Sequence, residues 1–326
     1  MKNVCILVPE SSVMQAIADP QYLFSAANQF LQAAGKAALF NVQLVGATHE
    51  VKLNDGIFSV HPDRNLDEAD KPDLVIIPAL FGDMETAIEK NKILIPWIND
   101  QYEKGAEIAS LCVGAFLLAS TGLLNGKKCS THWGFQNQFR ELFPEVEVMD
   151  GSIITEEYRI YSSGGANSYW NLLLHLLEKY TDRETAILAS KYFAIDIDRE
   201  NQNAFAMFKG QKNHNDDAVH KAQGFIESNI NEKITIDELA DMAFLGRRSF
   251  ERRFKQATNN SVLEYIQRVK IEVAKRSFES SRKNINEVMF DVGYSDTKAF
   301  RTIFKKITGL TPIEYRNKYN KMSVEK

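Results

Sequence analysis

A cysteine stands at the point where a β-rich run passes directly into a helical pattern. Residues 107–111 favour a strand, Cys112 follows, and residues 113–116 begin a helix. A thiol in such a turn lies at a helix N-terminus, where the helix dipole is expected to lower its pKa. His132 stands 20 residues further on and is a candidate base. The first chemistry that the sequence suggests is therefore a nucleophilic cysteine paired with a histidine.

The other cysteines and the histidines predict no further chemistry. Cys5 and Cys129 lack recognisable partners and are expected to be buried and inert, and three cysteines without framework spacing indicate reduced thiols. The six histidines show no metal-ligand spacing and no phosphate-cradling glycine loop occurs, so neither a metal nor a cofactor is expected. No apolar run reaches the ~18 residues of a membrane span or resembles a signal peptide, which predicts a cytoplasmic protein without a membrane partner.

The distribution of charge divides the chain into an acidic part and a basic part. The 326 residues carry a net charge of −4, but residues 219–326 contain 21 lysine and arginine residues against 14 aspartate and glutamate residues, a net +7. Residues 1–218 hold the other 18 basic and 29 acidic residues, a net −11. The asymmetry favours a basic domain that binds a polyanion. Two ordinary surfaces of opposite sign are the alternative.

The first 197 residues have the alternating pattern of an α/β domain. Strands are expected at 4–8, 42–45, 74–78 and 107–111, and helices at 22–34, 85–102, 167–180 and 183–192. The near-continuous apolar run at 73–77 is typical of a strand covered on both faces of the sheet. Periodicity is lost from 198 to 218, and this polar segment is expected to link two domains.

The last hundred or so residues contain an internal repeat. The recurring residues are Phe250, Phe254, Lys255, Thr258, Ser261, Glu264 and Tyr265, which correspond fifty residues later to Phe300, Phe304, Lys305, Thr308, Thr311, Glu314 and Tyr315. A helical unit of roughly 50 residues has therefore been used twice.

Each repeat predicts a helix-turn-helix unit. In the first unit, Thr235 and Glu238 fit a capping box, residues 243–246 form the turn, and a second helix spans 247–258. Its two phenylalanines stand four residues apart and are expected to face the core. The side chains expected to face outward and to bind DNA are those of Arg247, Arg248, Glu251 and Arg252.

The second unit repeats this arrangement. Asn284 and Glu287 can form a capping box, Gly293 supplies the turn, and Ser295 or Asp296 caps the second helix. A major groove admits one α-helix, and side chains near the N-terminus of that helix reach the base edges. The side chains expected to do so are those of Thr297, Lys298, Arg301 and Thr302.

Residues 262–278 between the two units predict one connecting helix that fixes the spacing of the two reading helices. Several cations on or near it, with one on the second reading helix, are expected to contact phosphates and to add affinity without sequence choice. These residues are Arg268, Lys270, Lys275, Arg276 and Lys305. A solvated helix face is the alternative for each of them.

Residues 219–319 resemble the DNA-binding domain of the AraC/XylS family. The signature is carried by Ile285-Asn286-Glu287-Val288, Val292-Gly293-Tyr294, Ala299-Phe300-Arg301, Phe304-Lys305, Thr308-Gly309, Thr311-Pro312 and Glu314-Tyr315-Arg316. The resemblance implies an all-α domain with two helix-turn-helix units that bind a double-stranded DNA operator. Two positions depart from the family pattern, because Phe244 stands where small residues are common and Gly246 where a serine or threonine cap is usual.

Residues 1–197 resemble the ThiJ/PfpI, class I glutamine amidotransferase-like superfamily. The resemblance is carried by Cys112, by His132 within Thr131-His132-Trp133, and by the loop Ser163-Gly164-Gly165-Ala166-Asn167. It implies a flavodoxin-like α/β sandwich. The order of the two domains is similar to that of the GlxA-type branch of AraC regulators over nearly the whole chain, and that similarity implies a homodimer.

Two departures from the superfamily pattern bear on the chemistry of Cys112. Ala16 stands where a carboxylate is often found, and Leu80 and Phe81 add bulk to the loop whose amides would form an oxyanion hole. No catalysis is therefore expected, and the first domain is expected to bind a small metabolite, with nitrogenous compounds as candidates. The residues expected to line this pocket are Cys112, His132, Trp133, Phe81 and Asn167. The alternative is a cysteine-dependent hydrolase or amidase-like enzyme that uses Cys112 and His132 and has an accessory DNA-binding module.

The sequence as a whole predicts a transcription regulator with a ThiJ/PfpI-type sensor domain at 1–197, a linker at 198–218 and an AraC-type DNA-binding domain at 219–326. The expected partners are operator DNA, a small-molecule effector, a second copy of the chain and RNA polymerase. An effector can change transcription only if it favours one arrangement of the domains over another.

Overall fold

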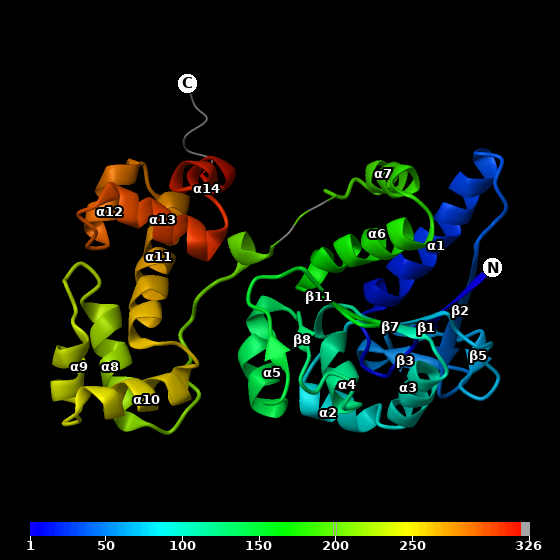
Figure 1. Cartoon of the computed structure of the whole chain (residues 1–326), viewed down its shortest axis with the longest axis horizontal. Helices are drawn as coiled ribbons and strands as arrows, with labels where there is room; N and C mark the ends of the chain where they lie inside the picture. The colour runs from blue at the N-terminus through cyan, green and yellow to red at the C-terminus, as the bar shows by residue number, and fades with distance from the viewer. Residues whose placement is uncertain (198, 200, 321–326) are drawn as a thin grey trace. The chain divides into compact units, whose positions relative to one another are not determined.

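A computed structural model describes residues 1–197, 199 and 201–320, and the chain divides into two compact units, Met1–Gln202 and Asn203–Lys326 (Figure 1). The boundary falls inside the segment 198–218 that the sequence predicts as a linker, and residue 203 already belongs to the second unit. Positions 198 and 200 of that linker, and positions 321–326 of the predicted C-terminal domain, lie outside the described residues.

The first unit is built on a seven-stranded sheet with the order β10-β11-β7-β6-β1-β2-β5. Its strands are β1 (Lys2–Leu7), β2 (Phe40–Gly46), β5 (Arg64–Asn65), β6 (Leu74–Ile77), β7 (Glu107–Ser110), β10 (Ile154–Glu157) and β11 (Ile160–Ser163). β10 runs antiparallel to β11, and all other neighbours are parallel. All four residues of β6 are buried, as its continuous apolar sequence predicts. The four predicted strands are β1, β2, β6 and β7, and the predicted α/β class is confirmed.

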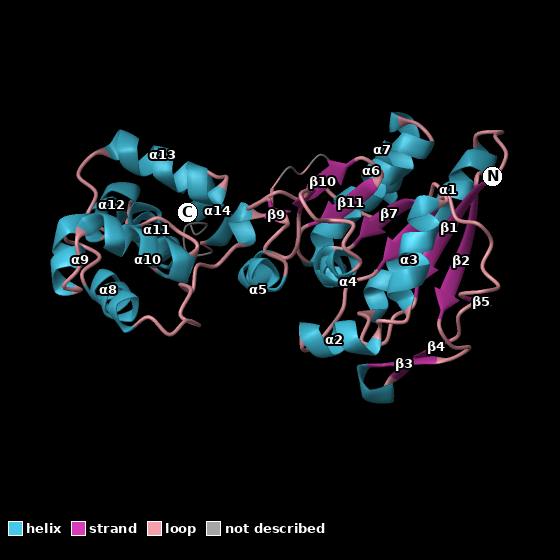
Figure 2. Cartoon of the chain, turned by 60° about the horizontal axis from the view of Figure 1, so that its bottom comes forward, coloured by secondary structure: helices cyan, strands magenta, loops and turns pink. Residues whose placement is uncertain are grey.

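Helices cover both faces of this sheet (Figures 1 and 2). On one face lie α1 (Met14–Ala33), α6 (Tyr169–Tyr180) and α7 (Arg183–Tyr192), which contact one another. On the other lie α2 (Met84–Lys90), α3 (Leu94–Glu103), α4 (Ala115–Ser120) and α5 (Gln136–Leu142). Two short strand pairs complete the unit, β3 (Val51–Leu53) with β4 (Phe58–Val60) and β8 (Lys128–Cys129) with β9 (Glu147–Val148).

The single helix predicted at 85–102 is wrong, because the structure has two helices there. Asn91 ends α2, and its side chain exchanges hydrogen bonds with the backbone of Glu10. Pro96 lies in the first turn of α3, where its missing N–H breaks no helical hydrogen bond, whereas a continuous helix would require that donor. The helix predicted at 22–34 begins earlier, at Met14, and runs through Pro20.

The second unit consists of helices. They are α8 (Asp217–Ser228), α9 (Ile236–Met242), α10 (Arg247–Thr258), α11 (Val262–Ser280), α12 (Ile285–Asp291), α13 (Thr297–Thr308) and α14 (Pro312–Tyr319), after a short 3-10 turn at Asn203–Phe205. The predicted all-α class with two helix-turn-helix units is confirmed. The first helix-turn-helix unit is α9 and α10, and the second is α12 and α13. The two predicted reading helices are therefore α10 and α13.

α11 belongs to two hydrophobic cores at once. Its first half, including Tyr265, packs in a core with Phe250 and Phe254, and its second half, including Phe278, packs in a core with the phenylalanine pair of α13. The four phenylalanines of the two reading helices have no exposed surface, so their predicted inward orientation is confirmed. The connecting helix therefore forms part of two lobes of the second unit, one built around each of these cores.

Capping explains most of the repeated residues that are not in the cores. The predicted capping boxes at Thr235 and Asn284 are both formed, and Asp296, not Ser295, caps α13 through the amides of Lys298 and Ala299. Further capping boxes join Ser261 to Glu264 and Thr311 to Glu314 at the starts of α11 and α14. The Ser/Thr and Glu of the repeat thus define where the helix after each reading helix begins.

Candidate functional site

α10 presents the predicted outward residues of the first helix-turn-helix unit. Arg248 and Arg252 are exposed, and Glu251 is partly exposed. Arg247 is also exposed, but its guanidinium lies 3.1 Å from a carboxylate oxygen of Asp237 on α9 and 3.7 Å from Glu251. Arg248 and Arg252 are therefore the cations near the start of this helix that point into solvent without an acidic partner, within the range 1–197, 199 and 201–320.

Arg253, on the same helix, has a different role that sequence reasoning missed. Its guanidinium donates two hydrogen bonds to the carboxylate of Asp216, at 2.8 and 2.9 Å. Asp216 also caps α8 by accepting from the amide of Val219, and the bond from Arg253 is the main reason that its pKa lies below the ordinary value. This bidentate pair fixes α10 relative to α8. Asp216 lies in the predicted linker, so no pattern in the sequence pairs it with a reading helix.

α13 presents the predicted outward residues of the second helix-turn-helix unit. Lys298, Arg301, Thr302 and Lys305 are exposed, and Thr297 is partly exposed. Lys298 and Arg301 form no ion pair with any residue that the structure describes. Two unneutralised cations near the start of a helix whose opposite side is packed are suited to a polyanionic groove.

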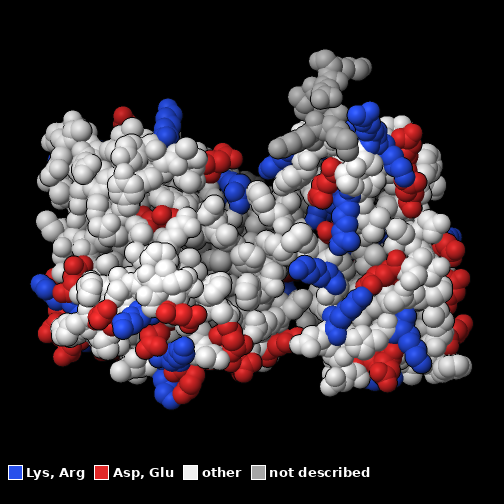
Figure 3. Space-filling model, turned by 180° about the vertical axis from the view of Figure 1, so that it is seen from behind, with Lys and Arg blue, Asp and Glu red and all other residues white. Residues whose placement is uncertain are grey.

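The charge of the second unit is not gathered into one basic patch on the face that Figure 3 draws. On the face drawn in Figure 3, lysine and arginine side chains of this unit stand among aspartate and glutamate side chains. The net positive charge of residues 219–326 therefore does not locate the interface by itself. The exposed cations of α10 and α13 stay the predicted interface, because both helices occupy the same place in the repeat.

Two of the predicted phosphate contacts are wrong, because their side chains are buried. Lys275 is 4% exposed, and its Nζ donates to a carboxylate oxygen of Glu272 at 2.7 Å and to the carbonyl oxygen of Ala206 at 2.5 Å. Lys270 is 7% exposed and donates to the carbonyl oxygen of Glu232 at 3.0 Å. A helix that serves two cores has little free surface, and both lysines face inward. Arg268 is partly exposed and lies over the ring of Phe208, and Arg276 is exposed, so their phosphate contacts stay predictions.

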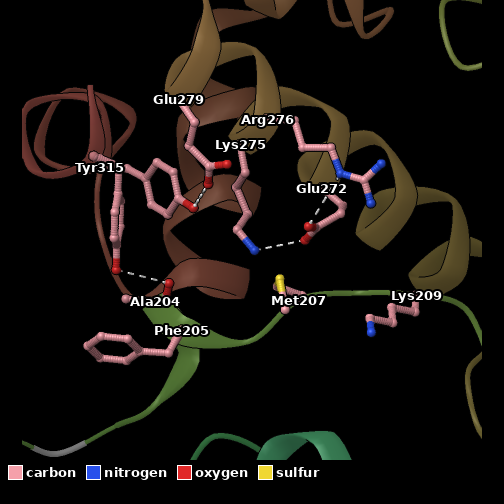
Figure 4. Close-up of a pocket in the computed structure, with 10 residues that line it drawn as sticks. Ala204, Phe205, Met207, Lys209, Glu272, Lys275, Arg276, Glu279 and Tyr315 are labelled. Atoms are coloured by element: carbon pink, nitrogen blue, oxygen red, sulfur yellow. Dashed lines mark hydrogen bonds and ion pairs between the residues drawn. The ribbon is translucent and has the colours of Figure 1, made fainter. Parts of the chain in front are cut away.

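The lysine at 275 holds the start of the second unit against α11. Residues 203–211, here called the arm, run along this helix, and the amide of Phe208 donates to Glu272 at 3.1 Å. The arm also contacts α14, where the hydroxyl of Tyr319 donates to the carbonyl of Ala204. Figure 4 shows Lys275 and Glu272 directed toward one another beside the arm. The arm, α11 and α14 line an open pocket of about 290 Å³. Most of the predicted linker is thus a packed part of the second unit.

Cys112 occupies a strained turn at the end of β7. Its φ of 56° lies in the left-handed region, which non-glycine residues rarely adopt. The turn is held by the hydroxyl of Ser163, which accepts from the amide of Cys112 at 3.0 Å, and by the hydroxyl of Thr131, which donates to the Cys112 carbonyl at 3.1 Å. Gly114 is required next to it, since a Cβ there would lie 2.4 Å from the carbonyl oxygen of Pro78. The predicted strand-to-helix elbow is confirmed.

The expected lowering of the Cys112 pKa is wrong. Burial raises the pKa of this thiol to about 11, and the hydrogen bonds from the amides of Val113 and Ala166 offset only part of that effect. The side chain is 6% exposed, so loss of hydration outweighs the helix dipole. Cys5 and Cys129 are buried as predicted, and burial raises the pKa of each to about 12.

His132 is not arranged as a base for this thiol. Its Nδ1 accepts a hydrogen bond from the amide of Gly134 at 3.0 Å, so the neutral ring carries its proton on Nε2. Burial lowers its pKa, which favours this neutral form. Gly165 packs against the ring, since a Cβ there would lie 2.7 Å from its Cδ2. The structure brings Cys112, His132 and the loop at 163–166 together, but no hydrogen bond joins the thiol to His132 among the described residues.

The groups that would assist a nucleophile are also committed elsewhere. The amide of Phe81 donates to the carbonyl of Ser11 at 2.7 Å, so it does not point into an oxyanion site. Ala16 is buried, and the nearby carboxylate of Asp19 accepts from the hydroxyl of Tyr169 at 2.6 Å and from the indole of Trp170 at 2.9 Å. The departures seen in the sequence therefore coincide with amides and carboxylates that serve the fold.

The other predicted pocket residues are placed differently from one another. Trp133 is partly exposed and stacks near His132, with ring centroids 5.2 Å apart. Phe81 is 68% exposed and Asn167 is exposed, and a role for them in a pocket stays a prediction.

Gln202 was missed by sequence reasoning because it lies in the predicted linker. It is 1% exposed, its Oε1 accepts from the amide of Gly165 at 2.8 Å, and its Nε2 donates to the carbonyl of Thr131 at 3.0 Å. One side chain thus joins the histidine loop to the glycine loop. A polar residue at the end of a domain gives no sequence signal for such a position.

We expect Cys112 to react with iodoacetamide at pH 7 at least about 100-fold more slowly than a free thiol, because only the thiolate reacts and the raised pKa depletes it. The rate should rise roughly tenfold per pH unit up to about pH 10. Mass spectrometry of the alkylated peptide between pH 6 and 10 measures this, with urea-unfolded chain as the control. A rate that levels off below pH 8 would contradict the pKa.

Membrane-spanning helices and metal clusters are both absent from the part of the chain that the structure describes. No helix in the described ranges is long and apolar enough to cross a membrane. In the same ranges, no group of three or more histidine, cysteine, aspartate or glutamate side chains could hold a metal ion.

Two family models match the chain. Residues 16–179 match the model of the DJ-1/PfpI family, and residues 239–318 match that of a helix-turn-helix domain. The first match runs from the first turn of α1 to the end of α6 and includes the cysteine elbow. The second covers both reading helices.

One similar relative aligns with more of the chain than either unit contains by itself. The chain is 26% identical over 268 residues, 82% of its own length and 72% of the relative's, to the HTH-type transcriptional regulator GbdR of Pseudomonas aeruginosa. It is 23% identical over 223 residues, 66% of each chain, to the HTH-type transcriptional regulator GlxA of Rhizobium meliloti. A solved structure of a protein from Vibrio parahaemolyticus, described as a transcriptional regulator, superposes with a TM-score of 0.52 at 26% identity and covers 59% of this chain and 98% of that one.

Proposed function

The chain belongs to the DJ-1/PfpI family in its first unit and carries an AraC-type helix-turn-helix domain in its second, and on this basis we propose that it regulates transcription by sequence-specific binding to DNA. The observation that carries the proposal is that α10 and α13 bury matching phenylalanine pairs and turn exposed cations outward. In this proposal each helix enters a major groove of one duplex, and the α11 helix sets the distance between them.

The side chains divide by role in this proposal. Those near the start of the reading helices contact base edges, and the guanidinium of Arg301 is the strongest candidate because arginine binds guanine with two hydrogen bonds. Lys305, Arg268 and Arg276 contact phosphates and add affinity that is independent of sequence. The buried Lys270 and Lys275 hold the two lobes and the arm, and they do not contact DNA.

The first unit is proposed to bind a small effector near the elbow and not to catalyse a reaction. The support is a thiol whose pKa is raised, a histidine whose Nδ1 is occupied by Gly134, and a Phe81 amide that is bonded to Ser11. Trp133, Phe81 and Asn167 remain the proposed surroundings of the effector. A cysteine-dependent hydrolase would need a base and an oxyanion site in place of these bonds.

The remaining partners of the proposal follow from the mechanism. The chain acts in the cytoplasm, where its DNA is, and forms a homodimer, as the similarity of its domain order to GlxA-type regulators suggests. The dimer contacts RNA polymerase at the regulated promoter. The effector acts by binding one arrangement of sensor and reading units more tightly than another.

Changing Arg301 to alanine is expected to weaken binding to the preferred duplex, which is the one that the wild-type chain selects from a random library, by about 1 to 3 kcal/mol. The change should also relax base choice at one position. Gel shifts with the preferred duplex and with a scrambled duplex of the same composition measure both effects. Lys305→Ala is the matched control on the same helix, since removal of a cation that touches only phosphate should weaken both complexes equally. Equal reductions for Arg301→Ala on the two duplexes would demote this residue to a phosphate-binding role.

A further inference from the structure

Phe244, in the turn of the first helix-turn-helix unit, combines two unfavourable properties. Its φ is 52°, in the left-handed region that bulky side chains rarely adopt. Its side chain is 95% exposed, the highest value among the exposed large apolar residues in the described part of the chain. Neither the backbone nor the hydration of this residue favours phenylalanine.

The second helix-turn-helix unit shows what the fold itself requires at the position of Phe244. Gly293 occupies the same position in its own turn, one residue after the C-cap of α12, and has a φ of 72°. A Cβ at Gly293 would lie 2.6 Å from the carbonyl oxygen of Asn231, so glycine is needed there for packing as well as for conformation. At Phe244 the backbone lies in the same left-handed region, but the side chain meets solvent.

The aromatic ring therefore does nothing for the folded unit that glycine would not do better. A strained residue that the surrounding structure does not use is a candidate for a contact with a partner. The ring lies at the entry to α10, two residues before its N-cap, and the exposed Arg247 and Arg248 follow directly.

The surroundings of Phe244 favour DNA over a protein partner. Within residues 230–260, Met242 is the one other large apolar side chain that is exposed, at 41%. A protein hot spot is normally surrounded by contacts that exclude water, which an exposed ring with one other exposed apolar side chain in this range does not provide. In a major groove the apolar groups are the 5-methyl groups of thymine, and phenylalanine is one of the side chains that contact them.

We propose that Phe244 packs against the methyl group of a thymine at the edge of the site bound by α10, and so adds a base preference to the first helix-turn-helix unit. The inference rests on the proposed function, because it requires α10 to lie in a major groove. It assigns a reading role to a residue outside both reading helices.

The test replaces single methyl groups on the DNA. A duplex is selected from a random library by the full-length wild-type chain, and each thymine is then replaced in turn by deoxyuridine, which removes only the methyl group. Fluorescence anisotropy gives the Kd of each duplex for the wild type, Phe244→Gly and Phe244→Asn. The affinity of the wild type should fall about threefold to fivefold at one thymine, the effect of one buried methyl group, and both variants should be insensitive at that thymine.

Two controls separate the possible outcomes. Phe58→Ala, which changes an exposed aromatic residue of the N-terminal compact unit, Met1–Gln202, should respond to deoxyuridine as the wild type does. Phe244→Gly should melt at the same or a higher temperature than the wild type, so that weaker binding is not caused by unfolding. If the variants keep the thymine sensitivity of the wild type, or are defective only in transcription activation, the inference is overturned in favour of a protein contact. If the wild type selects no duplex at all, the proposed function itself fails.

Discussion

Changing Lys275 to methionine is expected to lower the free energy of unfolding of the second unit by about 3 kcal/mol. The side chain of Lys275 is 5% exposed and that of Glu272 is 10% exposed, so the substitution leaves an acidic side chain buried without its main partner. It also removes the hydrogen bond to the carbonyl of Ala206, which is one of the contacts that hold the arm against α11. Methionine fills a similar volume, and the destabilisation therefore reports on charge and hydrogen bonding more than on packing.

The tryptophans allow the two units to be followed separately. Trp97, Trp133 and Trp170 are the three tryptophans of the chain, and all lie in the first unit. In urea titrations the fluorescence transition should therefore stay where it is, while the far-ultraviolet circular dichroism of the helical unit should change at lower urea. A shift of both transitions by the same amount would show that the effect is not confined to the second unit.

Two further variants test the cause of this destabilisation. Arg276→Met changes the next residue of α11, whose side chain is 67% exposed, and should alter stability by less than about 0.5 kcal/mol. Adding Glu272→Gln to Lys275→Met should recover roughly half of the stability, because an amide can still accept from Phe208 without a buried charge. No recovery would show that the hydrogen bond to the arm, and not the charge, carries the stability.

Removal of the four exposed cations near the starts of the reading helices is expected to weaken binding to the preferred duplex on the order of 10⁴-fold at physiological salt. The variant combines Arg248→Ala, Arg252→Ala, Lys298→Ala and Arg301→Ala. Each side chain is exposed and none has an acidic partner in the described ranges, so the effects should add and the fold should be kept. The slope of log affinity against log salt should also fall, by about 0.9 for each phosphate that the protein no longer neutralises.

The matched control removes the same charge from the other unit. It carries alanine at four exposed lysines of the first unit, Lys52, Lys71, Lys90 and Lys128. Its affinity for the duplex should stay within about threefold of the wild type, since those charges lie outside the proposed interface and act only through screened long-range attraction. Equal reductions in the two variants would mean that net charge, not the reading helices, accounts for binding.

The sequence was informative where local rules act alone. Capping boxes at Thr235 and Asn284, the bounds of α10, and the inward phenylalanines follow from spacing within one helix, and the structure has them as predicted. The repeat strengthened these predictions because the same residue types recur at the same places in both units. The elbow at Cys112 was likewise marked by a strand that meets a helix without a spacer.

The sequence was not informative where two elements share a residue. Lys270 and Lys275 are of a residue type that helices usually expose to solvent, but α11 is covered on nearly every side by two cores and the arm, which no single-helix pattern reveals. Gln202 and Asp216 lie in a polar stretch, and their hydrogen bonds reach to segments far away in sequence. The pKa of Cys112 depends on its burial in the folded unit, which outweighs the helix dipole that the motif suggested.

The arm lies along α11 in the opposite chain direction, with Ala206 beside Lys275, Phe208 beside Glu272, and Gly210 beside Tyr265. The arm therefore runs past both cores and supports the joint between the lobes. In the proposed function, the arm stiffens the connection through α11, and we expect the chain to prefer operators whose half-sites match the separation that α11 sets. Detachment would make the joint compliant, and operators with an inserted or deleted base pair between the half-sites would then be tolerated.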